Sequence, residues 1–191
     1  MDKFKLNTCN IDGLYIIEPN VHFDNRGYFL ESYNKREFEN LGIKTDFVQD
    51  NHSSSICRVI RGLHFQINNP QEKLIRVING KIYNVVVDLR IDSPTYSRWF
   101  GLELSDENKL MLYIPAGFAN GFLSLSDNTE INYKVSAYYD RVNERGIIWN
   151  DPEINIDWQF EKYNIKNPII NDKDLKLPNL KDFISPFKIN K

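Results

Sequence analysis

Residues 59–66, Val-Ile-Arg-Gly-Leu-His-Phe-Gln, hold the side chains best suited to moving protons. His64 is one of only three histidines in 191 residues, and Arg61, Gln66 and Lys73 lie near it in the sequence. Imidazole titrates close to neutral pH, so a histidine beside cationic groups suits acid–base chemistry on an anionic substrate. The alternative is a histidine satisfied by hydrogen bonds in a structural role.

The same stretch has the alternation of a β-strand, in which successive side chains point to opposite faces. This alternation predicts that His64 and Gln66 share one face and that Arg61 and Phe65 take the other. We therefore expect a polar site formed by His64 and Gln66 inside an otherwise apolar barrel.

Four other segments carry more polar groups than a purely structural strand needs. They are Arg26 with Glu31 at a strand entry, Gln49 with Asn51 after an apolar strand, the small-residue loop 114–122 containing Asn120, and a strand with Tyr133 followed by Tyr139. Each also has an ordinary explanation, because turn charges are commonly solvated and strand tyrosines commonly pack.

Composition excludes several classes of partner and compartment. The formal net charge is −2 and the pI about 5.9, so neither nucleic acid nor an anionic membrane is expected as a partner. Two cysteines, Cys9 and Cys57, make neither a disulfide framework nor a metal cluster. No apolar run has the length of a signal peptide or membrane span, so the sequence predicts a cytoplasmic protein.

The histidine count also argues against a metal or cofactor. A β-barrel metal site draws on clustered histidines and carboxylates. Here Gln66 follows His64, and the remaining histidines, His22 and His52, lie upstream. An iron-dependent oxygenase is disfavoured for the same reason, and no glycine-rich dinucleotide or Walker motif occurs.

Short β-prone runs separated by turn residues favour a sandwich or barrel. The predicted strands are 14–18, 28–33, 47–51, 59–66, 74–78, 81–89, 99–104, 110–114, 121–125, 131–139 and 146–149. Asn79-Gly80 between two apolar strands predicts a β-hairpin.

One helix is expected over 34–41, with Asn34 as its cap and Glu37 as the capping-box partner. The tail from about residue 152 is polar, carries a short helix near 172–176, and is expected to wrap the domain. The sequence therefore predicts one domain over 1–191.

A series of ordered motifs resembles the dTDP-4-dehydrorhamnose 3,5-epimerase family from about residue 10 to 175. The motifs are Phe23-Asp24-x-Arg26-Gly27-x-Phe29-x-Glu31, Val48-Gln49-Asp50-Asn51-x-Ser53-x-Ser55, Arg61-Gly62-Leu63-His64-Phe65-Gln66, Gln71-x-Lys73-Leu74, Val87-Asp88-Leu89-Arg90-x-x-Ser93-Pro94-Thr95, Pro115-x-Gly117-Phe118-Ala119, Tyr133-Lys134, Trp149-Asn150-Asp151-Pro152 and Ile156-x-Trp158. The resemblance implies a cupin-type jelly roll, a homodimer that exchanges an N-terminal segment, and no metal or cofactor.

The resemblance also implies an activity and residue roles. The substrate would be a nucleotide-linked 4-keto-6-deoxy sugar, converted from the dTDP-4-dehydro-6-deoxyglucose to the dTDP-4-dehydrorhamnose type for a bacterial surface polysaccharide. His64 matches the base, Tyr133 the acid, and Asp174 the carboxylate that orients His64, with Asp172 as a competitor. The substrate-binding positions implied are Arg26, Glu31, Gln49, Asn51, Arg61, Gln66, Lys73, Asn120, Tyr139 (stacking on the base), Glu144 and Lys173.

Two positions depart from the family pattern, which usually has aspartate at Asn84 and histidine at Asn120. The exchange replaces an ionisable pair with two neutral amides that can still hydrogen-bond. It indicates either co-adapted drift or altered handling of the sugar. The alternatives are therefore an epimerase acting only at C3 or C5, a GDP-linked substrate, or a sugar-nucleotide-binding module without catalysis.

Overall fold

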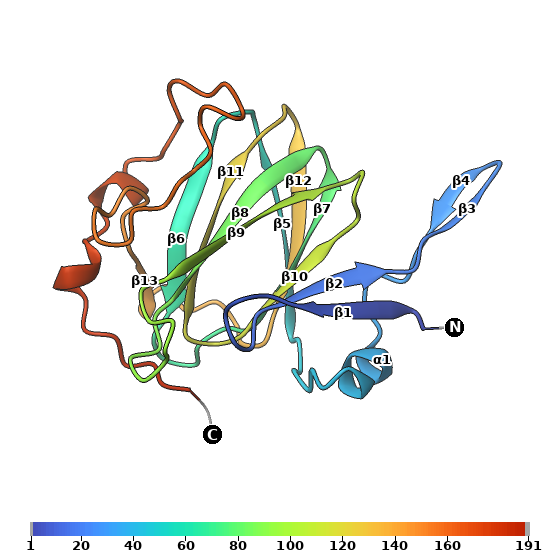
Figure 1. Ribbon diagram of the computed structural model, residues 1–191, viewed down its shortest axis with the longest axis horizontal. Helices are drawn as coiled ribbons and strands as arrows, with labels where there is room; N and C mark the ends of the chain where they lie inside the picture. Colours follow the sequence, from blue (N-terminus) through green and yellow to red (C-terminus); the bar gives the residue numbers. More distant parts are fainter. Residues whose placement is uncertain (1, 190–191) are drawn as a thin grey trace.

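The computed structural model describes residues 2–189, which form two antiparallel sheets packed face to face (Figure 1). The larger sheet has the order β1 (Phe4–Thr8), β2 (Tyr15–Pro19), β10 (Met111–Ile114), β7 (Lys73–Asn79), β12 (Thr129–Val135) and β5 (Gln49–Ser55). The smaller sheet has the order β13 (Glu144–Gly146), β6 (Ile60–Gln66), β11 (Phe118–Ser124), β8 (Lys81–Asp88) and β9 (Trp99–Ser105). The fold is the all-β, cupin-like jelly roll that the sequence predicts.

The inner core lies between the two sheets. It is filled by side chains from both, including Ile75, Val77, Ile82, Val86, Leu104, Leu112, Phe122 and Ile131. On β8, Val86 points into this core, whereas Val85 and Val87 point outward beneath the tail. Because both faces of β8 are buried, its sequence is an almost continuous apolar run.

The predicted hairpin at Asn79-Gly80 is wrong. Strand β7 pairs with β10 and β12, and β8 pairs with β11 and β9, so the two strands belong to different sheets. Both edges of each strand are already occupied, and Gly80, at φ +77°, makes the corner between the sheets.

Two further layers cover the outer faces. Helix α1 (Lys35–Asn40) lies against the larger sheet through Phe38, and Asn34 caps it as predicted, accepting a hydrogen bond from the backbone N–H of Glu37. The tail packs Trp158, Leu180 and other apolar side chains on the smaller sheet. The helix expected near 172–176 is the 3₁₀ turn η1 (Asp174–Lys176), followed by η2 (Leu180–Asp182).

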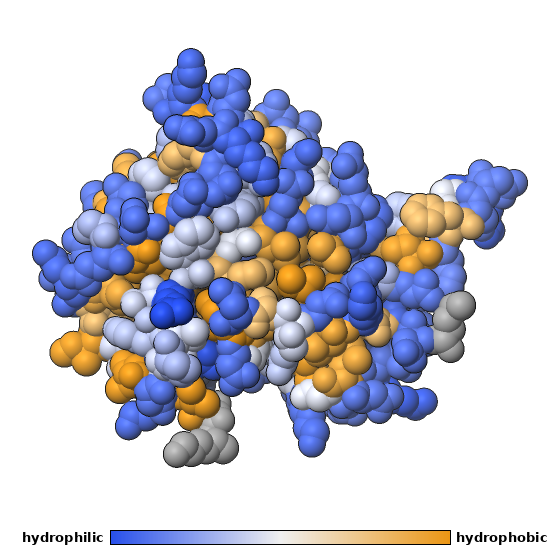
Figure 2. Space-filling view, in the orientation of Figure 1, coloured by the Kyte–Doolittle hydropathy of each residue, from blue (hydrophilic) through white to orange (hydrophobic). Residues whose placement is uncertain are grey.

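The predicted strand 28–33 is shorter than expected and belongs to a projecting hairpin formed by β3 (His22–Asp24) and β4 (Gly27–Phe29). Figures 1 and 2 show it standing clear of the sheets. Phe23 is 75% exposed and Phe29 is 67% exposed. Strand β1 was not predicted at all. Among residues 2–189, no helix is long and apolar enough to cross a membrane.

Candidate active site

A cavity of about 180 Å³ opens between the two sheets. Polar side chains from both sheets and from the tail surround an apolar floor. The lining residues are Ser53, Arg61, His64, Lys73, Ile75, Asn120, Gly121, Phe122, Ile131, Tyr133, Asn171 and Asp174. The cavity therefore gathers six of the residues predicted for a site: Arg61, His64, Lys73, Asn120, Tyr133 and Asp174.

A β-bulge on β6 brings Arg61 and His64 to the same cavity, contrary to the alternation predicted from the sequence. On β11, Asn120 pairs with His64 and Phe122 pairs with Arg61, so three steps on β6 match two on β11. The extra residue in β6 moves the side chains that precede it to the opposite face of the sheet. Gly62 has φ +118°, and a Cβ there would lie 2.6 Å from the Cα of Gly121. Only glycine fits this bulge.

His64 and Asp174 form a hydrogen-bonded pair on one wall. The Nε2 atom of His64 lies 2.8 Å from Oδ1 of Asp174, and the backbone N–H of Gly62 donates to Oδ2 at 3.1 Å. Burial opposes ionisation of Asp174, but the hydrogen bond and charge of His64 hold the pKa of the carboxyl below its usual value. An ionised carboxylate can only accept, so Nε2 carries the proton of this hydrogen bond, and in the neutral form of the ring Nδ1 presents a lone pair.

The structure separates the two candidate carboxylates. Asp174 is fully buried, whereas Asp172 is exposed. The backbone N–H of Asp174 donates to Oδ1 of Asn171 at 2.8 Å, which fixes the start of η1. It is therefore Asp174 that the tail delivers to His64.

The larger sheet contributes Lys73 from β7 and Tyr133 from β12. Burial lowers the pKa of Lys73 to about 8, against an opposing attraction from Glu144. Burial raises the pKa of Tyr133, although the positive charge of Arg61 opposes the shift. The ammonium group of Lys73 makes no hydrogen bond or ion pair with any residue in 2–189. The cavity thus combines a neutral phenol with a cation that is available to a ligand.

A second group of predicted residues does not line the cavity but is linked to His64 through Glu144. Glu144 lies on β13, where Oε1 is 3.9 Å from Nδ1 of His64. Its Oε2 accepts hydrogen bonds from the hydroxyl of Tyr139, at 3.0 Å, and from the ammonium of Lys173. The backbone N–H of Tyr139 donates to Gln49, at 3.1 Å.

The side chain of Gln49 in turn donates to Asn51, at 2.8 Å. Gln49 and Asn51 occupy alternate, half-buried positions of β5, and continuing that alternation reaches Ser53 on the cavity wall. Sequence reasoning missed Ser53 as a site residue, although this spacing could have found it.

Three further predicted residues belong neither to the cavity lining nor to the hydrogen-bonded group around Glu144. Gln66 is buried, and its side-chain amide bonds backbone groups of residues 68, 69, 138 and 140. Arg26 lies in the projecting hairpin and pairs with Asp24. Glu31 pairs with Lys3 and accepts from Asn34. The expected polar site of His64 with Gln66 is therefore wrong, because loop backbone takes up the Gln66 amide.

Asn84 and Asn120 form a side-chain pair across β8 and β11. The Nδ2 atom of Asn120 donates to Oδ1 of Asn84 and to the carbonyl of Val85, both at 3.1 Å. Asn84 is fully buried, and within the described range its own Nδ2 has no partner. The pair fixes the orientation of Asn120 on the cavity wall.

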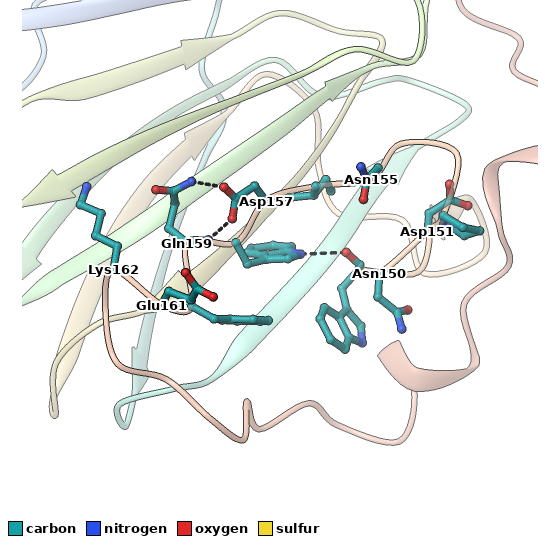
Figure 3. A pocket seen from close by; sticks show the side chains of 12 residues that line it. Asn150, Asp151, Asn155, Asp157, Gln159, Glu161 and Lys162 are labelled. Atoms are coloured by element: carbon teal, nitrogen blue, oxygen red, sulfur yellow. Dashed lines mark hydrogen bonds between the residues drawn. The ribbon is translucent and has the colours of Figure 1, made fainter.

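A larger hollow, of about 600 Å³, lies on the tail (Figure 3). Its aromatic rings serve packing: the indole N–H of Trp158 donates to the carbonyl of Trp149 at 2.8 Å, and Trp149 meets Phe160 edge to face. In the described part of the chain, no three histidine, cysteine or carboxylate side chains gather to hold a metal ion.

The comparisons with known proteins agree with the fold. The family model described as dTDP-4-dehydrorhamnose 3,5-epimerase matches residues 8–182. A dTDP-4-dehydrorhamnose 3,5-epimerase from Methanothermobacter thermautotrophicus is 49% identical over 174 residues, covering 91% of this chain and 93% of the relative.

Solved structures give the same result. A Legionella pneumophila dTDP-6-deoxy-D-glucose-3,5-epimerase in complex with dTDP-4-keto-L-rhamnose superposes with TM-score 0.89 at 40% identity, covering 93% of each chain. A Bacillus anthracis dTDP-4-dehydrorhamnose 3,5-epimerase with TDP and PPi bound gives 0.88 at 46%, covering 93% and 99%. A 3'-monoepimerase from Streptomyces bikiniensis in complex with dTDP-quinovose gives 0.83 at 31%, covering 91% and 86%.

Fold and comparisons together define an isomerase of the epimerase type, built on a cupin-like jelly roll. The chain belongs to the dTDP-4-dehydrorhamnose 3,5-epimerase family.

Proposed function

We propose that this chain epimerises a nucleotide-linked 4-keto-6-deoxy sugar, converting dTDP-4-dehydro-6-deoxyglucose to dTDP-4-dehydrorhamnose without a cofactor. The observation that supports this most is the His64–Asp174 pair, which shares one cavity with Tyr133 and Lys73. These groups are the base, acid and cation that the reaction requires.

The proposed reaction begins at a carbon next to the ketone, whose hydrogen is acidic because the resulting carbanion is delocalised as an enolate. Nδ1 of His64 takes that proton. The C–H electron pair then forms a C=C bond, and the carbonyl π pair moves to the ketone oxygen. The Lys73 ammonium stabilises the oxyanion. Tyr133 donates its hydroxyl proton to the opposite face of the same carbon, which restores the ketone and inverts the centre.

We assign substrate binding to the groups around that cavity. Arg61, held by the hydroxyl of Ser55 at 3.1 Å and the carbonyl of Ser54 at 2.9 Å, supplies positive charge for the diphosphate. The exposed ring of Tyr139 stacks on the base. The substrate-contacting set is completed by Gln49, Asn51, Asn120, Glu144 and Lys173.

The projecting hairpin is proposed to complete the site of a second copy in a homodimer. Exposed aromatic side chains on an arm that leaves its own domain favour burial against another subunit, and Phe23 and Phe29 are of this kind. In this arrangement Arg26 and Glu31 reach the partner's nucleotide. Replacing both phenylalanines with serine should shift sedimentation toward monomer, whereas an unchanged dimer would refute the arm's role.

Inversion of a single carbon is the second candidate, favoured by the Asn84–Asn120 amide pair and by the likeness to a 3'-monoepimerase. Incubation with dTDP-4-keto-6-deoxyglucose in deuterated water separates the two. Deuterium at both C3 and C5 supports the first proposal, and deuterium at one carbon supports the second. A GDP-linked analogue tests the nucleotide. Binding of dTDP- and GDP-linked sugars without any exchange would indicate a binding module and refute both.

A further inference from the structure

The side of His64 that faces away from Asp174 has a second carboxylate next to it. Oε1 of Glu144 lies 3.9 Å from Nδ1, and the Glu144 side chain is only 18% exposed. Because Tyr139 and Lys173 both donate to Oε2, the carboxylate is held with Oε1 toward the imidazole. His64 is thus placed between a buried carboxylate on Nε2 and a rim carboxylate beside Nδ1.

Each inversion leaves the two proton-transfer groups unable to start another. In the proposed reaction, His64 ends as an imidazolium and Tyr133 as a phenolate. Nδ1 must lose its proton before a second carbon or a second substrate molecule reacts. Asp174 offers no route for that proton, because it is fully buried and bonded to the other ring nitrogen.

The other charged groups around His64 limit which group can accept the proton from Nδ1. Arg61 and Lys73 are cations and cannot accept a proton from an imidazolium. Burial opposes the ionisation of Glu144, but its hydrogen bonds from Lys173 and Tyr139 and the charge of His64 keep its pKa below the usual value. Glu144 is therefore ionised at neutral pH, and its partly exposed side chain is in contact with solvent.

We propose that Glu144 is the proton relay that resets His64 between inversions. Oε1 accepts the proton from Nδ1 and releases it to solvent water, while the Tyr133 phenolate takes one proton from water, so protons balance. The separation exceeds a hydrogen bond by about 1 Å, a distance that side-chain rotation covers. This role rests on the proposed epimerase function and makes Glu144 act through His64.

The test compares the first turnover with later ones in deuterated water, using the whole chain and dTDP-4-keto-6-deoxyglucose. Because Glu144 is also assigned to the substrate-contacting set, the comparison is made at saturating substrate, where a change in binding does not alter the rate. In Glu144→Gln, we then expect one exchange event per active site at close to the unmodified rate, followed by turnover slowed at least about tenfold. Added formate should restore the slow phase and leave the first event unchanged. Glu144→Asp keeps a carboxylate and should retain more of the later turnover.

The matched control is Glu130→Gln, which removes the same group beside a different histidine, His52, 3.2 Å away and outside the cavity. Both phases should be unaffected in this variant. Equal slowing of both phases in Glu144→Gln, a change in KM alone, or no response to formate would overturn the relay. If the unmodified protein shows no exchange, the proposed function itself fails.

Discussion

Asn84 and Asn120 share one hydrogen bond in the smaller sheet, and it leaves the buried Nδ2 of Asn84 without a partner among residues 2–189. An unpaired buried N–H group costs free energy, because it loses its bond to water and gains none. A carboxylate at position 84 would instead accept the bond from Asn120. Position 84 therefore meets the needs of Asn120 with its oxygen alone, and its own buried N–H group is left over.

The first prediction concerns this pair. Asn84→Asp buries a carboxylate beside one neutral donor, so we expect a loss of about 2 kcal/mol in unfolding free energy at pH 7. Desolvation raises the pKa of that carboxyl above its unfolded value, so the loss should shrink as the pH falls and the group takes up its proton. Adding Asn120→His supplies a cationic partner and should recover stability. Urea unfolding at pH 7 and pH 4 measures both effects, and a double variant no more stable than the summed singles would contradict co-adaptation.

The second prediction concerns the His64–Asp174 pair. In Asp174→Asn, the amide can donate to Nε2, which favours the ring form with its proton on Nδ1 and so removes the base. Exchange in deuterated water should fall about 10²–10⁴-fold. Asp172→Asn is the control, because Asp172 is exposed and should leave exchange unchanged. Loss of exchange in both variants would show that the tail as a whole is needed, not this carboxylate.

The third prediction concerns pH. Burial lowers the pKa of Lys73 to about 8, and only the protonated amine stabilises an oxyanion. Turnover should therefore decline as the pH rises through about 8, below the range in which Tyr133 ionises. Lys73→Arg keeps a charge that does not titrate there and should remove this decline, whatever its maximal rate. A pH–rate profile whose alkaline limb is the same in both proteins would assign the limb to another group.

The fourth prediction concerns the bulge. In Gly62→Ala, the new Cβ would lie 2.6 Å from the Cα of Gly121 and 2.7 Å from the carbonyl oxygen of Asn120, at a φ that side chains avoid. We expect a loss of at least about 2 kcal/mol. Gly42→Ala is the matched control, since Gly42 has φ +90° but open space around it. Denaturant unfolding that shows equal losses would mean that backbone strain alone, and not the close approach, requires glycine.

The sequence predicts the buried strands well, because strands such as β8 must be apolar on both faces in any sheet arrangement. It does not predict which strands pair. The Asn79-Gly80 corner has the local chemistry of a hairpin, and only competition from β10, β12, β11 and β9 for the strand edges excludes that pairing. Strand β1 escaped prediction because three of its five side chains are polar.

The candidate site could likewise be predicted in its residue types but not in its geometry. The polar side chains near His64 are evident from the sequence. The face of β6 on which Arg61 lies depends on the bulge at Gly62, and a regular two-residue alternation does not predict a bulge. The choice between Asp172 and Asp174 also needs the tail to be placed. Gln66 is predicted to bind a ligand because of its residue type, but its side-chain amide is hydrogen-bonded to the backbone of nearby loops.

The docking of the tail sets the order in which the site can be assembled during synthesis. Ile169 pairs with Val59 beside β6, and every strand of the two sheets ends by Gly146. Asp174 lies 110 residues after His64 in the chain, so during synthesis their hydrogen bond forms only after all these strands have been made. A chain severed between Gly146 and Asn171 would keep the thirteen strands found in residues 2–189 and lose the carboxylate that is hydrogen-bonded to His64. If the proposed mechanism holds, cleavage in that stretch would abolish activity while removing none of the strands in residues 2–189.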